Sequence, residues 1–178
     1  MESNKTISIL GGTGDLGTGI AKRLIRANYK VIIGSRKLEA AQASAKLLSS
    51  SCEGLLNKDA AKKGDISILT VPFAHHESTI NSCFNELQDK IFIDATVPLM
   101  PPKVGTVQLP ESQSAAVSAQ LILGKEVKVV SAFQNISAEL LKNDQSIDCD
   151  VLVCGNNKEA RQEVIDLIKK MGMKGWHA

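Results

Sequence analysis

Two short stretches near the start of the chain carry residue types suited to binding a phosphorylated ligand. In the first, GGTGDLG, Gly12, Gly14 and Gly17 match the spacing G-x-G-x-x-G between an apolar run and a helical pattern. The first glycine of this motif permits a tight turn, the second lets the backbone approach a pyrophosphate, and the third lets the helix pack close to the strand. Backbone N–H groups of residues 13–16 would then meet the phosphates at the helix N-terminus. A glycine turn without a ligand is the alternative interpretation.

The second stretch, VIIGSRK, indicates which dinucleotide is bound. An NAD site usually has Asp or Glu about 20 residues after the glycines, where it accepts a hydrogen bond from the ribose 2′-hydroxyl. No acid ends the apolar run 31–33; Gly34, Ser35, Arg36 and Lys37 follow it instead. Because arginine grips phosphate bidentately and serine donates a hydrogen bond, this pattern favours the 2′-phosphate of NADP(H) over NAD(H). Solvated loop charges at Arg36 and Lys37 are the alternative.

Residues for acid–base or nucleophilic catalysis are sparse. The single tyrosine, Tyr29, is followed by Lys30 and then an apolar run, so the Tyr and Lys pair of short-chain dehydrogenases is absent. Histidines at helix starts, such as His75 and His76, are more often caps or surface residues than catalysts, although His75 lies where a loop near a nicotinamide is expected. We therefore expect no catalytic side chain and no metal site. Direct hydride transfer between two stacked rings fits this composition, because it demands positioning and water exclusion while the cofactors carry the electronic change.

Apolar runs alternate with amphipathic stretches, a pattern typical of an α/β fold. It predicts a Rossmann-type, doubly wound, mostly parallel sheet with helices on both faces. We treat residues 1–178 as one NADP-binding domain. The alternative is that residues 148–178 begin a smaller C-terminal extension. Loop 97–111 holds four prolines and is long enough to be functional. Strands are expected at 7–10, 31–33, 66–71, 90–95, 127–133 and 150–154, helices at 15–27, 38–48, 58–63 (capped by Asn57), 74–87, 112–123 (capped by Ser112) and 158–171 (capped by Asn157), and an irregular connection at 52–56.

Composition and charge exclude several classes of function. The chain has 21 basic and 19 acidic residues, a formal net charge of +2, and scattered lysines, which gives no support to nucleic-acid or membrane-surface binding. No apolar run approaches the roughly 20 residues that cross a bilayer, and the first residues lack a signal pattern, so we expect a cytoplasmic protein. The four cysteines are not spaced as paired CxxC ligands. Because Cys83, Cys149 and Cys154 lie in or beside apolar segments, we expect small buried thiols, with metal binding or a redox pair as the alternative.

Further stretches extend the pattern beyond nucleotide binding. In order they are ISILGGTGDLGTGIAKRL, VIIGSRK, DISILTVPFAH, KIFIDATVPL, SAAV, KVVSAFQNISAELL and DVLVCGNN. Together they resemble the NADPH-dependent coenzyme F-420 reductases over nearly the whole chain. The resemblance implies a Rossmann domain that passes hydride between NADP(H) and the deazaflavin ring of coenzyme F-420, its second substrate. It leaves a homodimer open.

The resemblance also implies roles for single residues. Phe73 takes the place of an aromatic residue beside the nicotinamide half of the cofactor, and Val97 and Pro98 take positions that face the deazaflavin. The expected cofactor contacts are Gly12, Thr13, Gly14, Asp15, Leu16, Ser35, Arg36, Phe73 and Ala138, and the expected contacts to the second substrate are Val97, Pro98 and Gln134.

The chain departs from the family pattern at a few places. Gln134 stands where some members carry His, and Ala40 where some carry Lys. The family usually continues past Ala178 with a Gly-Pro-Leu segment and helices that help form the F-420 pocket, so a truncated form, a short homologue and a module completed by another chain all stay open. Two alternative functions remain: an NADP-dependent reductase of another acceptor, such as a flavin or a small imine, and a non-catalytic NADP-binding sensor or partner subunit.

Overall fold

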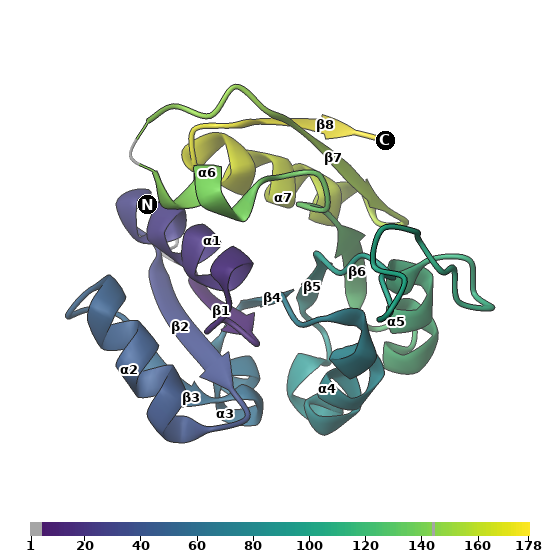
Figure 1. The fold of residues 1–178 in the computed structure, drawn as a ribbon, viewed down its shortest axis with the longest axis horizontal. Coiled ribbons are helices and arrows are strands. Elements are labelled where there is room, and N and C mark those ends of the chain that lie inside the picture. The colour runs from purple at the N-terminus through teal and green to yellow at the C-terminus, as the bar shows by residue number, and fades with distance from the viewer. Residues whose placement is uncertain (1–4, 144) are drawn as a thin grey trace.

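Eight strands form one sheet in the order β3-β2-β1-β4-β5-β6-β7-β8. In the computed structural model, which describes residues 5–143 and 145–178, helices cover both faces of this sheet (Figure 1). The strands from β3 to β6 in this order run parallel, β7 runs antiparallel to β6, and β8 runs parallel to β7. The predicted doubly wound, mostly parallel α/β fold is therefore confirmed.

Strands and helices alternate along most of the chain. The strands are β1 Thr6–Leu10, β2 Lys30–Ser35, β3 Glu53–Leu56, β4 Ile66–Leu69, β5 Ile91–Asp94, β6 Lys128–Ser131, β7 Asp150–Gly155 and β8 Lys174–His177. The helices are α1 Asp15–Arg26, α2 Leu38–Leu48, α3 Asn57–Lys63, α4 His76–Ser82, α5 Ala115–Leu123, α6 Ala138–Lys142 and α7 Lys158–Lys170, with 3-10 turns η1 Phe73–His75 and η2 Phe84–Leu87. No helix in the part of the chain that the structure describes has the length and apolarity needed to cross a bilayer.

Two clusters of buried apolar side chains line the two faces of the sheet. Ile9 of β1 and Leu24 of α1 belong to the cluster that also includes side chains of α2, α6 and α7. Leu10, the next residue of β1, belongs to the other cluster, with Ile80 of α4 and Leu123 of α5. Successive side chains of a strand point to opposite faces, so a strand covered on both sides needs apolar residues at both. This explains the mostly apolar runs on which the fold prediction rested, in which Ser8 of β1 and Ser67 of β4 are buried and hydrogen-bond to each other at 2.8 Å.

The chain changes from one face of the sheet to the other between β1 and β4, which lie side by side at its centre. β1 leads into α1 on one face, and β4 leads through η1 into α4 on the other. Open α/β sheets bind their ligands in the crevice at the carboxyl ends of such strands. The glycine-rich turn lies at this point, directly after β1.

Three local predictions were wrong. Residues 53–56 form a strand, β3, rather than an irregular connection, because they pair with the edge of β2 from Ile32↔Glu53 to Ser35↔Leu56. The helix expected at 74–87 is divided into η1, α4 and η2, since its Ser, Thr and Asn residues favour local side-chain bonds over a continuous helix. The cap of α5 is Ser114 rather than Ser112: Ser114 Oγ accepts from the N–H of Val117 at 3.1 Å.

The structure adds α6 and β8, which the sequence pattern did not predict. Helix α6 has five residues and depends on α1, where the buried Arg23 donates from Nε to the carbonyl oxygen of Leu141 at 3.0 Å and from Nη2 to that of Gln145 at 2.8 Å. Strand β8 has four residues and pairs with β7. The prediction of a buried thiol is confirmed at Cys83 and wrong at Cys154, which lies on the exposed side of β7.

Candidate functional site

The glycine-rich turn packs so tightly against β1 that two of its glycines are required by the protein itself. A Cβ at Gly12 would lie 2.7 Å from the carbonyl oxygen of Ile9, and a Cβ at Gly17 would lie 2.6 Å from the Cα of Gly12. The Gly12 N–H donates to the carbonyl oxygen of Gly34 at 2.9 Å, which ties the turn to β2. The turn and the first turn of α1 therefore have a fixed shape.

Gly14 differs from the other two glycines of the motif, because protein packing does not require it. The nearest atom to a Cβ built there is 4.0 Å away, so the bare backbone leaves space above the turn. Gly14 is the N-cap of α1 and provides no side-chain cap, and the first N–H groups of a helix have no partner within the helix. Space and N–H donors at a helix N-terminus are what a phosphate needs. The turn therefore fits the pyrophosphate of a dinucleotide.

Asn57 supports this turn from the neighbouring segment, and the sequence analysis misread it. It was expected to cap the helix at 58–63, but it is the first residue of α3, and its Oδ1 accepts from the N–H of Gly11 at 3.1 Å. A Cβ at Gly34 would lie 2.8 Å from Asn57 Oδ1, so the glycine of VIIGSRK makes room for this contact. A buried asparagine after an apolar pair was the available signal, but it matches a helix cap equally well.

Ser35 and Arg36 lie at the carboxyl end of β2, beside the glycine turn. Ser35 is buried, and its Oγ accepts from the N–H of Lys37 at 3.3 Å, so its own O–H is available to donate. Arg36 is exposed. Both residues line a cleft of about 190 Å³, together with Gly14 and Asn57.

A wider cleft of about 500 Å³ continues from this one along the sheet edge. The two clefts share Gly14 and residues 70–72, so they form one groove across the point where the chain changes face. Most side chains that line the wider cleft are apolar: Leu16, Val71, Pro72, Phe73, Ala95, Val97, Leu99, Pro101 and Val104. Apolar walls with few polar groups suit a planar ring and exclude water from it.

The structure brings eight of the twelve predicted binding residues to this groove, namely Thr13, Gly14, Asp15, Leu16, Ser35, Arg36, Phe73 and Val97. The other four are not among the lining residues. Gly12 and Pro98 are buried, and Ala138 is half-buried at the start of α6. Gln134 is exposed, and its Nε2 donates to the carbonyl oxygen of Asp94 at 2.7 Å and to Ser131 Oγ at 2.9 Å.

Close contact between α1 and α6 explains why Ala138 lies near the turn despite its distance in sequence. A Cβ at Gly19 would lie 2.8 Å from Leu141 Cβ and 3.2 Å from the carbonyl oxygen of Ala138, so this glycine lets the helices touch. Lys142 also forms an ion pair with Asp15 in the first turn of α1. That pair places a cation beside the carboxylate nearest the phosphate-binding turn.

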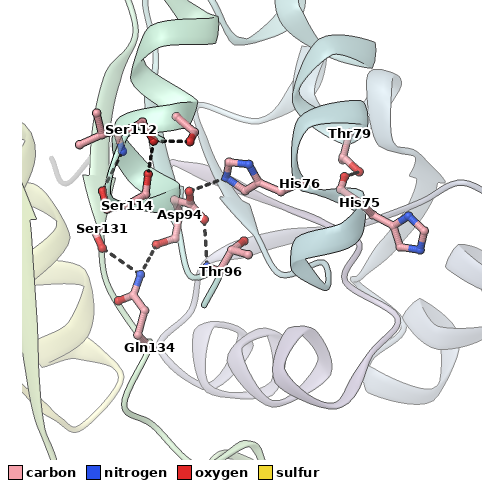
Figure 2. Close-up of polar contacts among 11 residues, drawn as sticks. His75, His76, Thr79, Asp94, Thr96, Ser112, Ser114, Ser131 and Gln134 are labelled. Atoms are coloured by element: carbon pink, nitrogen blue, oxygen red, sulfur yellow. Dashed lines mark hydrogen bonds and ion pairs between the residues drawn. The ribbon is translucent and has the colours of Figure 1, made fainter. Parts of the chain in front are cut away.

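A buried histidine–carboxylate pair links α4 to the end of β5, as Figure 2 shows. His76 Nε2 and Asp94 Oδ2 are 2.7 Å apart, and the side chains are 3% and 0% exposed. Asp94 Oδ1 accepts from the N–H of Thr96 at 2.9 Å, and the His76 ring centroid is 5.7 Å from that of Phe73. The expectation of a cap or surface role was therefore wrong for His76. An aspartate ending the apolar run IFID was a missed signal, because a buried carboxylate requires a partner.

Other features near or far from the groove add no reactive centre. His75 is half-buried and lines the narrower cleft, where its carbonyl oxygen accepts from Thr79 Oγ1 at 2.7 Å. In residues 5–143 and 145–178, no group of three or more His, Cys, Asp or Glu side chains is arranged to hold a metal ion. A larger depression of about 860 Å³ lies beside α5 at the amino end of β6, opposite the glycine turn. Its position, away from the turn, makes the groove the better candidate.

The fold and the groove define the class: a Rossmann-type nucleotide-binding domain of an oxidoreductase. Residues 6–98 match the family model described as "NADP oxidoreductase coenzyme F420-dependent". Over 93% of its length the chain is 45% identical to the F420-dependent NADP reductase of Methanocaldococcus jannaschii, of which it covers 79%. It is also 37% identical to the reductase of the same name from Methanothermobacter thermautotrophicus, covering 93% of this chain and 76% of that one. The chain therefore belongs to the coenzyme F-420-dependent NADP oxidoreductase family.

A solved structure supports the fold independently. A hypothetical protein from Sinorhizobium meliloti superposes with a TM-score of 0.82, covering 98% of this chain and 84% of that chain, at 22% sequence identity. At this identity the likeness shows the fold alone. The arrangement of the sheet and its helices thus occurs in another solved structure.

Proposed function

We propose that this oxidoreductase transfers a hydride between NADP(H) and the deazaflavin ring of coenzyme F-420. The observation that carries the proposal is the single groove that runs from Ser35 and Arg36, over the glycine turn, to the apolar cleft at Phe73 and Val97. One end offers donors for a 2′-phosphate, and the other offers apolar walls for rings. Family membership supplies the second substrate.

In this proposal the phosphate end of the groove holds NADP(H) through backbone and charge. The N–H groups of Thr13, Asp15 and Leu16 receive the pyrophosphate at the start of α1, where the helix dipole favours an anion. Arg36 grips the 2′-phosphate, and the Ser35 O–H donates to it. NADP(H) and F-420 supply the redox chemistry when bound.

At the ring end, the side chains position the two heterocycles and exclude water. Phe73 borders the nicotinamide half, Val97 and Pro98 border the deazaflavin, and Ala138 is a further contact to the cofactor. The Gln134 amide nitrogen is bonded to Asp94 and Ser131, so we assign the contact with the second substrate to the opposite end of that amide, Oε1. We assign no side chain as a proton donor, because hydride transfer between aligned rings depends on geometry.

Two further expectations stand as proposals, namely that residues 1–178 form one NADP-binding domain and that the protein is cytoplasmic, and a homodimer stays open. Light scattering of the purified protein after size exclusion tests the homodimer, since a dimer has twice the mass of one 19.1 kDa chain. A monomer at all concentrations would contradict it.

The decisive experiment mixes the purified protein with NADPH and oxidised F-420 and follows the absorbance of both. We expect equimolar loss of NADPH and of oxidised F-420, and much slower loss with NADH. Hydride transfer to a flavin or a small imine, but not to F-420, would show that the second substrate is another acceptor and contradict the assignment of F-420. Tight NADPH binding without transfer to any acceptor would point to a sensor or partner subunit and contradict the enzymatic proposal.

A further inference from the structure

One buried polar atom beside the groove lacks a protein partner. Thr96 Oγ1 is shielded from solvent and forms no hydrogen bond within the described part of the chain. Thr96 is 5% exposed and follows β5 by two residues, where it lines the wider cleft with Phe73 and Val97. Buried side-chain hydroxyls nearly always have a partner, so an unsatisfied one in a residue of a cleft wall calls for an explanation, and a ligand that this hydroxyl meets after rotation about χ1 provides one.

Asp94 lies two residues before Thr96, and each of its carboxylate oxygens already has a partner. Asp94 Oδ2 faces His76 Nε2 at 2.7 Å, and Asp94 Oδ1 accepts from the Thr96 N–H at 2.9 Å, as the dashed lines in Figure 2 show. His76 belongs to α4 and Asp94 to β5, so both members of the pair are fixed by regular structure. The pair therefore holds the Thr96 backbone in place and leaves its hydroxyl for another partner.

The walls beside Thr96 show what kind of partner this is. Val97, Leu99 and Val104 are apolar, so the hydroxyl is one of few polar groups that can orient a ring in this part of the cleft. A threonine hydroxyl both donates and accepts hydrogen bonds. Because Oγ1 is shielded in its present position, contact with a ligand requires a rotation about χ1, and a rotation of about 120° can bring the hydroxyl to the site now held by the methyl group without moving the backbone.

We propose that Thr96 Oγ1 hydrogen-bonds a carbonyl or amide group on the rim of a planar heterocycle bound in the wider cleft, and so sets how that ring is oriented. The inference rests on the proposed function, which places two such rings in the groove. The shared chemistry has two sources, the pyrimidine carbonyls of the deazaflavin and the carboxamide of the nicotinamide. Separate measurements on the two ligands distinguish them.

The test compares Thr96→Val, which removes the hydroxyl at nearly constant shape, with Thr96→Ser, which keeps it. Binding of NADPH and of oxidised F-420 is titrated separately by fluorescence, without turnover, and thermal unfolding is measured with no ligand. We expect Thr96→Val to weaken binding of one ligand about three- to tenfold, the usual effect of one lost neutral hydrogen bond. We expect Thr96→Ser to stay within about twofold of the wild type.

Thr96→Val should weaken ligand binding without lowering the stability of the unliganded protein, and this difference separates a binding role from a structural one. Because Thr96→Val removes an unsatisfied buried hydroxyl, its unfolding temperature should equal or exceed that of the wild type. Weaker F-420 binding identifies the deazaflavin as the partner, and weaker NADPH binding identifies the nicotinamide. Wild-type affinity of Thr96→Val for both ligands, or equal losses in both variants, would overturn the proposal. If the proposed function itself fails, the wild-type protein transfers no hydride to F-420, and this result is distinct from any difference between the Thr96 variants.

Discussion

At the scale of single residues, we propose that Arg36 is the side chain that decides between the two nicotinamide cofactors. It follows the buried Ser35 at the end of β2, is exposed, and lines the narrower cleft beside the turn that suits a pyrophosphate. A guanidinium in this place can reach a phosphate on the adenosine ribose but has no comparable partner on a free 2′-hydroxyl. The choice of cofactor therefore depends on one exposed charge and its serine neighbour.

Arg36→Ala should raise the Kd for NADPH about tenfold or more and leave the Kd for NADH within about twofold, because a charge-assisted hydrogen bond to phosphate is lost. Lys37→Ala is the matched control, since Lys37 is the adjacent exposed cation and is absent from the cleft wall. Fluorescence titration of both nucleotides with both variants measures the effect. Equal weakening of NADPH and NADH binding by Arg36→Ala would contradict the assigned contact.

The cysteines offer a second test at residue scale. Burial raises the pKa of the Cys52 thiol to about 11 and also raises that of Cys83, whereas Cys154 is exposed. The thiolate is the reactive form, so at pH 8 iodoacetamide should modify Cys154 first, and the rate at Cys52 should keep rising as the pH approaches 11. Peptide mass spectrometry resolves the sites. Equal rates at Cys52 and Cys154 in the folded protein, rather than only in urea, would refute this ordering.

At the scale of elements, the His76–Asp94 pair joins α4 to β5 beneath the ring end of the groove. It links the turn that carries Phe73 with the segment that carries Thr96 and Val97, and the Asp94 carbonyl oxygen also accepts from Gln134. Four predicted or proposed ring contacts are thus held by one buried carboxylate and its main chain. A buried pair of this kind keeps elements in register more than it adds net stability.

His76→Leu should lower the free energy of unfolding by about 3–5 kcal/mol, because it leaves the Asp94 charge buried without its partner. His76→Gln should lose less, since its amide can still donate to the carboxylate. The double variant His76→Leu/Asp94→Leu should be less destabilised than the sum of the two single variants. Urea unfolding of His76→Leu, His76→Gln, Asp94→Leu and the double variant measures this coupling. Additive losses would mean that the two side chains do not interact.

At the scale of the whole molecule, the groove joins segments that are far apart in sequence. The glycine turn, the end of β2, the end of β4 and the loop after β5 meet only because the strand order places β1 beside both β2 and β4. A ligand that spans this groove contacts all four segments in the folded chain and none of them together in the unfolded chain. Binding and global stability are therefore coupled.

NADPH at about 100 times its Kd should raise the free energy of unfolding by about 2.7 kcal/mol, as expected for a ligand that binds only the folded state. NADH at the same concentration should raise it less, and Arg36→Ala should reduce the NADPH effect to that of NADH. Thermal unfolding at several nucleotide concentrations measures each case. No rise in unfolding temperature with NADPH, in a folded protein, would contradict binding across the groove.

The sequence by itself determined the features that depend on local chemistry. Glycine spacing predicted a phosphate-binding turn, the pair Ser35–Arg36 predicted the cofactor, and mostly apolar runs predicted a parallel sheet covered on both faces. These signals are visible in sequence because a tight turn needs glycine and a doubly covered strand needs apolar residues on both sides. The resemblance to the F-420 reductases pointed to Phe73 and Val97, and the predicted strands put both at strand ends, where the structure places the groove.

The tertiary structure decided what depends on partners distant in the chain. Strands β3 and β8, with the sequences EGLL and KGWH, lack the apolar runs of the central strands, and helix α6 has only five residues. All three exist through contacts with β2, β7 and α1. In the sequence, Asn57 matches a helix cap and His76 matches a surface residue. Only the fold brings Gly11 beside Asn57 and Asp94 beside His76. The unsatisfied hydroxyl of Thr96 has no sequence signature, because satisfaction of a buried group depends on every neighbour that the fold brings to it.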